Sequence, residues 1–126
     1  MNMTPEGSRA VVLVVEDEPV VRMVAVDTIQ DAGYETIEAA DADSAIAILE
    51  ARKDIRIVFT DIHMPGSMNG RRLARAIRDR WPPIEFVLTS GFTKLRVSDM
   101  PERGVFLAKP YLPEDLAGAL SRFTLS

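Results

Sequence analysis

Apolar runs alternate along the chain with segments in which apolar residues recur at helical spacing. The first run, Ala10 to Val15, is continuous and rich in β-branched residues, as expected of a strand buried on both faces. Tyr34 to Glu38 alternates apolar and polar positions, which is typical of a strand nearer the edge of a sheet. Three further apolar runs also predict strands, namely Ile55 to Thr60, Ile84 to Thr89 and Val105 to Ala108.

The segments between these runs predict helices. From Val20 to Ala32 apolar residues recur at helical spacing, Pro19 suits a first turn, and Gly33 suits a left-handed C-cap. The residues in this pattern are Val20, Val21, Val24, Ala25, Thr28 and Ile29. The later helical faces comprise Ala45, Ile46 and Leu49, then Leu73, Ala74 and Ile77 within Asn69 to Arg80, and finally Leu116, Ala119, Leu120 and Phe123. With a short helix over Thr93 to Met100, the alternation favours an α/β fold, with a parallel sheet and helices on both faces.

The composition fits one soluble domain. The 126 residues are 47% hydrophobic and 27% charged. The net charge of −4 argues against a nucleic-acid or anionic-membrane surface, and the lack of cysteine excludes disulfides and thiol chemistry. No signal peptide or membrane span is apparent, so we expect a cytoplasmic protein. We expect residues 1–8 to form a disordered tail and residues 9–126 to form the domain.

Polar residues follow four of the five predicted strands. They are Glu16 and Asp17 after the first strand, Asp61 after the third, Ser90 after the fourth and Lys109 after the fifth. Each alone also fits an ordinary helix cap, turn or solvated side chain. Ligands of open parallel sheets bind outside the carboxyl ends of the strands, so the agreement of four ends predicts a functional site at this rim.

The residue types at this rim suggest phosphoryl chemistry. Three neighbouring carboxylates repel one another, and the pKa of at least one rises unless a cation is present. Hard oxygen ligands without a His or Cys cluster indicate Mg²⁺. An aspartate can attack phosphorus to give an acyl phosphate, while a metal ion, a lysine and a hydroxyl stabilise the phosphoryl oxygens.

From Ala10 to Phe123 the sequence resembles the receiver domain of two-component response regulators. The motifs that carry this resemblance, in order and spacing, are Val15-Glu16-Asp17-Glu18-Pro19, Thr60-Asp61-Ile62-His63-Met64-Pro65, Met68-Asn69-Gly70, Leu88-Thr89-Ser90-Gly91 and Ala108-Lys109-Pro110. The resemblance implies a doubly wound, flavodoxin-like sheet of five parallel strands in the order 2-1-3-4-5.

The resemblance also implies a role for each residue at the rim. Asp61 is then the phosphoacceptor, and Ser90 is a switch hydroxyl that moves toward the acyl phosphate. Lys109 pairs with the phosphate, and its bond to Pro110 is expected to be cis. The implied Mg²⁺ ligands are the carboxylates of Glu16, Asp17 and Asp61 and the backbone carbonyl of His63. Phe106 takes the place of the family's aromatic rotamer switch.

Three features depart from the family pattern. The loop after the phosphoacceptor is one residue longer, at Gly66-Ser67. Only 18 residues separate Ser90 from Lys109, and Asp99-Met100-Pro101 interrupts the 91–104 segment, so we expect a short or irregular fourth helix. Phe106 lacks the hydroxyl of the more common tyrosine, so any switching would act through burial alone.

The expected function is a phosphorylation-dependent switch that catalyses only its own phosphotransfer and dephosphorylation. A sensor histidine kinase or a histidine phosphotransfer protein would donate the phosphoryl group to Asp61, and the product would change contacts with a downstream protein. Because no effector segment follows Phe123, a phosphate sink or shuttle is an alternative. A receiver fragment of a hybrid histidine kinase is another, although Met1 favours a free-standing protein.

Other functional classes fit the sequence less well. Many Mg²⁺-dependent phosphohydrolases need a second acid two positions after the nucleophile, where this chain has His63. The intact acidic pair, Asp61, Ser90 and Lys109 argue against a binding module that is never phosphorylated. A flavin-binding protein would need a Gly/Ser-rich first loop, which is absent.

Several remaining residues have simpler interpretations than a role in catalysis. His63, the single histidine, is expected to contribute its carbonyl rather than its side chain. Arg71, Arg75 and Arg78 fall on one helical face, which favours a solvated surface. Trp81, before two prolines, is most simply a plug at a helix end, although an exposed tryptophan would be a docking anchor.

Overall fold

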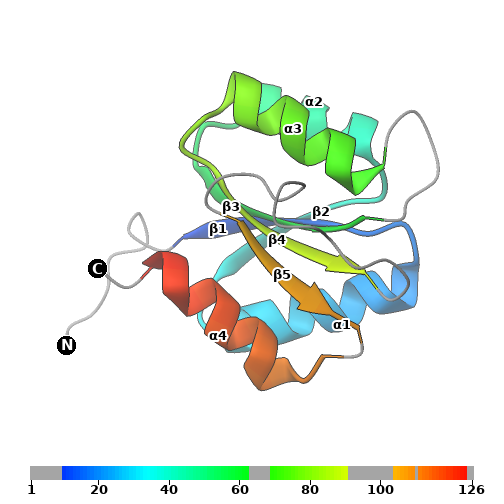
Figure 1. Cartoon of the computed structure of the whole chain (residues 1–126), viewed down its shortest axis with the longest axis vertical. Helices are drawn as coiled ribbons and strands as arrows, with labels where there is room; N and C mark the ends of the chain where they lie inside the picture. The colour runs from blue at the N-terminus through cyan, green and yellow to red at the C-terminus, as the bar shows by residue number, and fades with distance from the viewer. Residues whose placement is uncertain (1–9, 63–68, 91–103, 110, 125–126) are drawn as a thin grey trace.

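A five-stranded parallel sheet forms the centre of the molecule, with helices on both faces (Figure 1). The computed structural model describes residues 10–62, 69–90, 104–109 and 111–124. The elements, in chain order, are β1 (Val11–Val15), α1 (Pro19–Asp31), β2 (Glu35–Ala39), α2 (Ala42–Ala51), β3 (Ile55–Asp61), α3 (Gly70–Arg80), β4 (Glu85–Ser90), β5 (Gly104–Ala108) and α4 (Pro113–Thr124). The strand order is β2-β1-β3-β4-β5, which confirms the predicted doubly wound topology.

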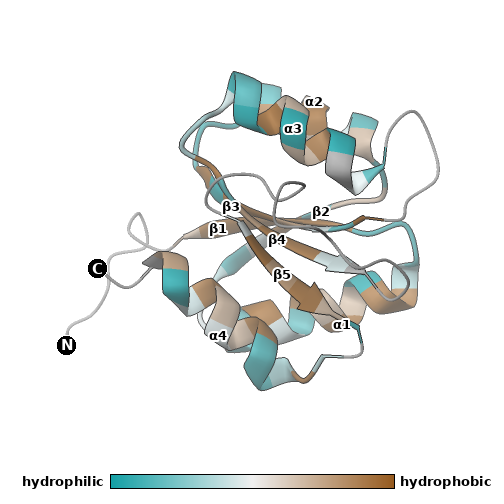
Figure 2. Cartoon of the chain, in the orientation of Figure 1, coloured by the Kyte–Doolittle hydropathy of each residue, from teal (hydrophilic) through white to brown (hydrophobic). Residues whose placement is uncertain are grey.

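Two hydrophobic layers hold the helices to the sheet. Leu13 and Val15 of β1 belong to the cluster under α2 and α3, whereas Val12 and Val14 belong to the cluster under α1 and α4. All five residues of β1 are buried, as its unbroken apolar run predicted. Figure 2 shows β4 and β5 as predominantly hydrophobic, whereas β2 is partly hydrophilic.

Strand β3 pairs irregularly with β1 at its start. Val11 pairs with Ile55, but Val12 pairs with Ile57, so β3 contains one extra residue at this point. Ile55 then faces the α2/α3 layer and Ile57 the α1/α4 layer. The skipped residue, Arg56, is exposed, as expected where a bulge displaces a side chain from the ladder.

Helix α1 begins and ends where the sequence predicted, but its buried face is different. Gly33 has a φ of 102°, which suits the residue after a helix C-cap. The buried residues are Ala25, Val26 and Ile29, whereas Val20 and Val24 are 68% and 57% exposed. At 3.6 residues per turn, Val20 and Val24 lie on the far side of the helix, so apolar character alone misidentified part of this face.

Two helices begin with side-chain caps. Asp41 accepts a hydrogen bond from the Ser44 backbone N–H at 2.8 Å, and Asn69 accepts one from the Arg72 N–H at 3.0 Å. Asn69 is therefore the N-cap of α3 rather than its first residue. No helix in the described part of the chain is both long enough and apolar enough to cross a membrane.

Several sequence predictions fall outside the described residues. They concern the 1–8 tail, the side chain and carbonyl of His63, the Gly66-Ser67 loop, the short helix of the 91–104 segment and the peptide bond before Pro110.

Candidate functional site

The sheet brings four of the predicted site residues to one edge. Asp61 ends β3 and pairs with Thr89, while Ser90 ends β4 and pairs with Ala108. Lys109 therefore follows β5 beside the end of β4. Glu16 follows β1, where its backbone N–H donates to the carbonyl of Ala39 at 3.0 Å.

A lysine ammonium group joins the two buried carboxylates at this edge. Lys109 Nζ lies 2.5 Å from Asp61 Oδ2 and 3.9 Å from Glu16 Oε1. Asp61 is 6% exposed and Glu16 is 2% exposed, while the Lys109 side chain reaches solvent. Because burial lowers the effective dielectric constant, this cation compensates the two carboxylates more strongly than it would at the surface.

Glu16 carries the clearest electrostatic signature of the site. Burial raises the pKa of Glu16 to about 7, with a further upward contribution from the charge of Asp61. The Glu18 backbone N–H, which donates to Glu16 Oε2 at 3.2 Å, and the Lys109 charge oppose this rise in pKa. Within the described part of the chain, Glu16 Oε1 has no hydrogen-bond donor.

Arg22 fixes the loop that carries the acidic pair, a role that the sequence analysis did not identify. Its Nη1 donates to the backbone carbonyl of Glu16 at 2.8 Å, and its Nε pairs with Glu38 Oε1 at 3.0 Å. The guanidinium group thereby links the loop after β1 to β2. No pattern in the sequence distinguishes this arginine from other helical surface residues.

Tyr111 is a second residue that the sequence analysis missed. Its ring meets Phe59 edge-to-face, with 6.2 Å between centroids. Burial, followed by the negative charges of Glu16 and Asp61, raises the pKa of Tyr111 to about 12. The phenol therefore stays protonated beside the carboxylates. The one feature of the sequence that could have indicated a role for Tyr111 is its position two residues after Lys109.

Gly70 allows α3 to begin directly against the end of β3. Its N–H donates to the Ile62 carbonyl at 2.9 Å. A Cβ at this position would lie 2.1 Å from the Asp61 carbonyl oxygen, so no larger residue fits without movement of the backbone. The sequence contained Asn69-Gly70 as a motif, but only the structure shows what the glycine contacts.

The other predicted site residues are described less completely. Asp17 is half-buried, and Phe106 is half-buried against the α2/α3 core cluster. Ser90 is placed by its backbone at the end of β4. His63 lies outside the described residues.

The donor chemistry of this edge suits a hard cation. A buried carboxylate oxygen without a hydrogen-bond donor, such as Glu16 Oε1, is costly unless a cation compensates it. Among the described residues, the cation that compensates Glu16 and Asp61 is Lys109. The described side chains contain no group of three acidic or histidine residues close enough together to bind a metal ion. The oxygen donors fit Mg²⁺ by type, because this ion favours carboxylates and water over nitrogen or sulfur.

Comparison with known proteins finds one family. The family model described as response regulator receiver domain matches residues 12–121. Sensor kinase CckA of Brucella abortus is 38% identical over 90% of this chain, which spans 12% of the CckA length. Response regulator protein FleR of Pseudomonas aeruginosa is 31% identical over 92% of the chain, which spans 25% of its length. Chemotaxis protein CheY1 of Helicobacter pylori is 32% identical, over 82% of this chain and 88% of its own.

Solved structures agree with the sequence comparison. The receiver domain of NtrX from Brucella abortus superposes with a TM-score of 0.80 and 35% identity, over 90% of this chain and 97% of that one. A response regulator receiver protein from Sinorhizobium medicae gives a TM-score of 0.85 at 26% identity, over 92% and 94%. The receiver domain of the hybrid histidine kinase CckA gives 0.78 at 30% identity, over 91% and 99%.

Proposed function

Because the chain belongs to the response regulator receiver domain family, we propose that it is a signalling switch controlled by phosphorylation of Asp61. The observation that carries this proposal is the contact between Lys109 Nζ and Asp61 Oδ2, at the carboxyl edge of the sheet. An aspartate that is buried, paired with a cation and next to a second acid suits phosphoryl transfer better than packing.

The proposed transfer uses Asp61 as the nucleophile. A carboxylate oxygen of Asp61 attacks the phosphorus of a phosphohistidine on a kinase or phosphotransfer protein. The P–N bond breaks, the imidazole leaves with the electron pair of that bond, and a P–O bond forms. The ammonium of Lys109 neutralises charge on the phosphoryl oxygens, and attack of water on the same phosphorus later restores Asp61.

The residues proposed to hold Mg²⁺ are the carboxylates of Glu16, Asp17 and Asp61 and the backbone carbonyl of His63. The bound ion would neutralise phosphoryl oxygens during the transfer. The raised pKa of Glu16 and its oxygen without a hydrogen-bond donor support this assignment, since both reflect a carboxylate in need of a cation. Arg22 would keep the acidic pair in place through the Glu16 carbonyl.

The proposed switch transmits the new charge through β4 and β5. Ser90, at the end of β4, would supply the hydroxyl that binds the phosphoryl group. Phe106 neighbours Leu88 across the β4–β5 pair and is half-buried, so it would change its burial when the end of β4 moves. Phosphorylation would then shift an existing equilibrium between inactive and active states.

The proposed output is contact with a downstream protein, in the cytoplasm. A phosphate sink or shuttle uses the same site chemistry. A receiver of a hybrid kinase is a specific alternative, because the chain is similar both to sensor kinase CckA and to the solved receiver of that hybrid kinase.

The test is modification of Asp61 by a small phosphodonor. The protein is incubated with acetyl phosphate, with and without Mg²⁺, and the intact mass is measured. We expect the mass of one phosphoryl group to be added when Mg²⁺ is present. Beryllofluoride with Mg²⁺ should shift the NMR signals of the Ile62 and Lys109 amides, because Ile62 follows Asp61 and the Lys109 side chain pairs with it.

The Asp61→Asn variant is the matched control, and it should show neither the added mass nor the NMR shifts. An unmodified wild-type protein under all conditions would instead indicate a binding module that is not phosphorylated. Continuous hydrolysis of several phosphate esters would indicate a phosphohydrolase.

A further inference from the structure

A second candidate site lies at the opposite end of the sheet from Asp61, where β3 and β4 begin. The turn between α2 and β3 and the turn between α3 and β4 enclose a pocket of about 290 Å³. Leu49, Ile55 and Ile84 contribute its apolar lining, and Trp81 with the two following prolines lines it further. We call this the Trp81 pocket. Its volume is close to the lower limit for small-ligand sites and is sufficient for one large side chain.

Four cations surround the Trp81 pocket, and two of them have carboxylate partners. Arg52 binds both oxygens of Asp54, at 2.9 and 2.5 Å. Arg80 pairs with Glu50 at 2.8 Å. These two pairs hold both guanidinium groups in place and cancel their charges locally.

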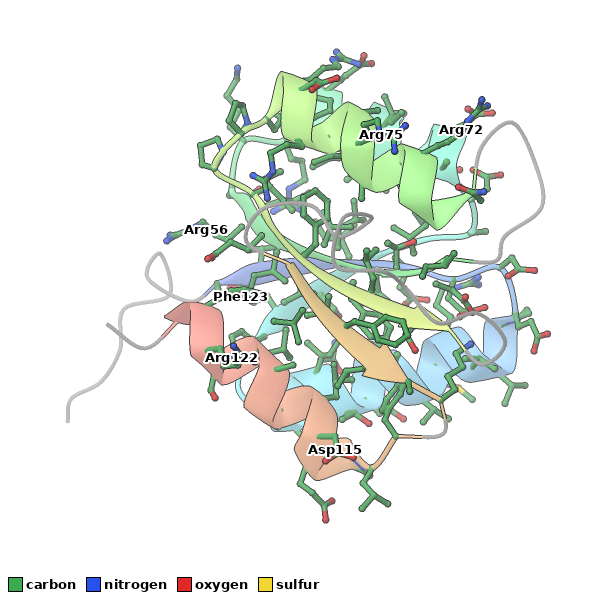
Figure 3. The ribbon with its side chains drawn as sticks, in the orientation of Figure 1. Arg56, Arg72, Arg75, Asp115, Arg122 and Phe123 are labelled. Atoms are coloured by element: carbon green, nitrogen blue, oxygen red, sulfur yellow. The ribbon has the colours of Figure 1, made fainter. Side chains whose placement is uncertain are left out.

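The other two cations, Lys53 and Arg56, give the rim its net positive charge. Both are exposed, and neither forms an ion pair with another residue in the described ranges. The bulge at the start of β3 turns Arg56 outward, and Figure 3 shows its side chain extending beyond that end of the strand. An apolar pocket with two uncompensated cations at its rim complements a ligand that combines an apolar group with negative charges.

The position of Trp81 favours carboxylates over a nucleotide base. The Arg80 guanidinium lies 4.4 Å from the centroid of the indole ring and covers one face. The Trp81 side chain is half-buried and packs against the α2/α3 core cluster, so less of the indole is left for a flat base to stack on. An apolar side chain would lie against Trp81, Pro82 and Pro83, which are the more exposed apolar residues of the lining.

We propose that the Trp81 pocket docks an acidic segment of a partner protein, with one large apolar side chain in the pocket and flanking carboxylates on Lys53 and Arg56. Tryptophan and arginine are the residue types that most often anchor protein interfaces. This site uses none of the residues around Asp61, so it stands apart from the proposed phosphorylation.

The probe is a blocked pentapeptide with phenylalanine at its centre and two glutamates on each side. Binding to the full chain is followed by Trp81 fluorescence and by NMR shifts of the Trp81 indole and Ile84 amide. We expect a saturable change that weakens as salt is added. A peptide with glycine in place of the phenylalanine tests the apolar anchor, and it should bind several-fold more weakly.

The variants separate this site from general attraction to positive charge. Lys53→Gln with Arg56→Gln should weaken binding by about three- to tenfold, as expected for two exposed ion pairs. A second double variant, Arg72→Gln with Arg75→Gln, removes the same amount of charge from α3, at a distance from Arg56 (Figure 3). This variant should leave binding unchanged. Asp61→Asn should also bind the peptide normally, which distinguishes this site from the phosphorylation site.

Three outcomes would overturn the proposal. One is the absence of saturable binding by the phenylalanine peptide. Another is an equal loss in both double variants, which would mean attraction to total charge alone. The third is saturable binding of AMP at Trp81 and Ile84 without binding of the peptide, which would make the pocket a nucleotide site.

Discussion

Lys109 is the residue on which the electrostatics of the site depend. The fold buries the carboxylates of Asp61 and Glu16 at neighbouring strand ends, and the Lys109 ammonium lies within 2.5 and 3.9 Å of them. Two buried like charges without a cation would repel each other in a medium of low dielectric constant. The same ammonium can thus stabilise the unmodified protein and, in the proposed phosphorylation, neutralise the phosphoryl group.

Replacing Lys109 should therefore destabilise the protein. We expect Lys109→Met to lower the free energy of unfolding at pH 8 by about 1–3 kcal/mol, a value reduced from the fully buried case because the lysine side chain reaches solvent. Urea unfolding measures the effect. In the Asp61→Asn background, Lys109→Met should lower the free energy of unfolding by a smaller amount. Equal decreases in both backgrounds would show that Lys109 and Asp61 do not stabilise each other.

Glu16 should make stability depend on pH in an unusual direction. Its pKa rises from 4.5 to about 7 on folding, so the folded state binds more protons than the unfolded state between these values. Stability should therefore fall as the pH rises through this window. In buffer without divalent cations, Glu16→Gln should stabilise the protein by up to about 3 kcal/mol at pH 8 and by almost nothing at pH 4.

Unfolding curves of the wild type and Glu16→Gln across this pH range are the measurement. Asp27→Asn is the control, since it removes an exposed carboxylate of α1 that forms no ion pair among the described residues, and so it reports the effect of losing one surface charge. A pH-independent difference for Glu16→Gln would show that the carboxylate is not penalised by burial.

The contact between α3 and the end of β3 fixes the position of the helix relative to Asp61. Helix α3 begins with Gly70 because its backbone approaches Asp61 and Ile62 too closely for a side chain. The N-cap at Asn69 fixes the start of the helix in this place. The rim of the sheet and the helix are therefore held as one unit.

Gly70→Ala should disturb this unit. Its Cβ would meet the Asp61 carbonyl at 2.1 Å, so we expect a loss of at least about 2 kcal/mol in the free energy of unfolding and slower modification by acetyl phosphate. Thermal unfolding and the mass assay measure these effects. Gly118→Ala is the matched control, because its Cβ would meet nothing within 4 Å and alanine favours a helix, so this variant should be neutral or slightly stabilised.

The elements were predictable from the sequence where a pattern is periodic and local. The apolar run of β1, the cap at Asp41 and the stop at Trp81 all involve neighbouring residues. The exposed side of α1 was not predictable, because burial depends on what packs against the helix. Val20 and Val24 have the same chemistry as buried residues and differ only in where they face.

The candidate site was also predictable where it depends on local sequence patterns, and unpredictable where it depends on packing. Strand ends of a parallel sheet share one edge, so the sequence pattern alone groups Glu16, Asp61 and Lys109. Arg22 and Tyr111 contribute through contacts with residues far away in the sequence, at Glu38 and Phe59. Such contacts follow from the packed structure, and the one local signal was the place of Tyr111 two residues after Lys109.

The whole molecule has an uneven charge distribution that separates its two candidate sites. Residues 52–80 contain eight basic and three acidic residues, while the remaining chain contains seven basic and sixteen acidic residues. Figure 3 shows labelled arginines on α3 and at the start of β3. Four of these cations, Arg52, Lys53, Arg56 and Arg80, line the Trp81 pocket, whereas Glu16 and Asp17 lie at the opposite end of the sheet.

This distribution leads to a prediction for the stability of the whole domain. Mg²⁺ binds the proposed acidic site only when the strand ends are assembled, so it should raise the free energy of unfolding by mass action. At ten times its dissociation constant the gain is about 1.4 kcal/mol, or a few degrees in Tm for a domain of this size. Thermal unfolding with MgCl₂, against NaCl of equal ionic strength, measures it. The gain should be largely lost in Asp61→Asn and in Glu16→Gln, because each removes a carboxylate from the set, and it should persist in Lys53→Gln with Arg56→Gln. An equal Mg²⁺ effect in all of these proteins would mean that the ion acts on the general acidity of the chain and not at Asp61.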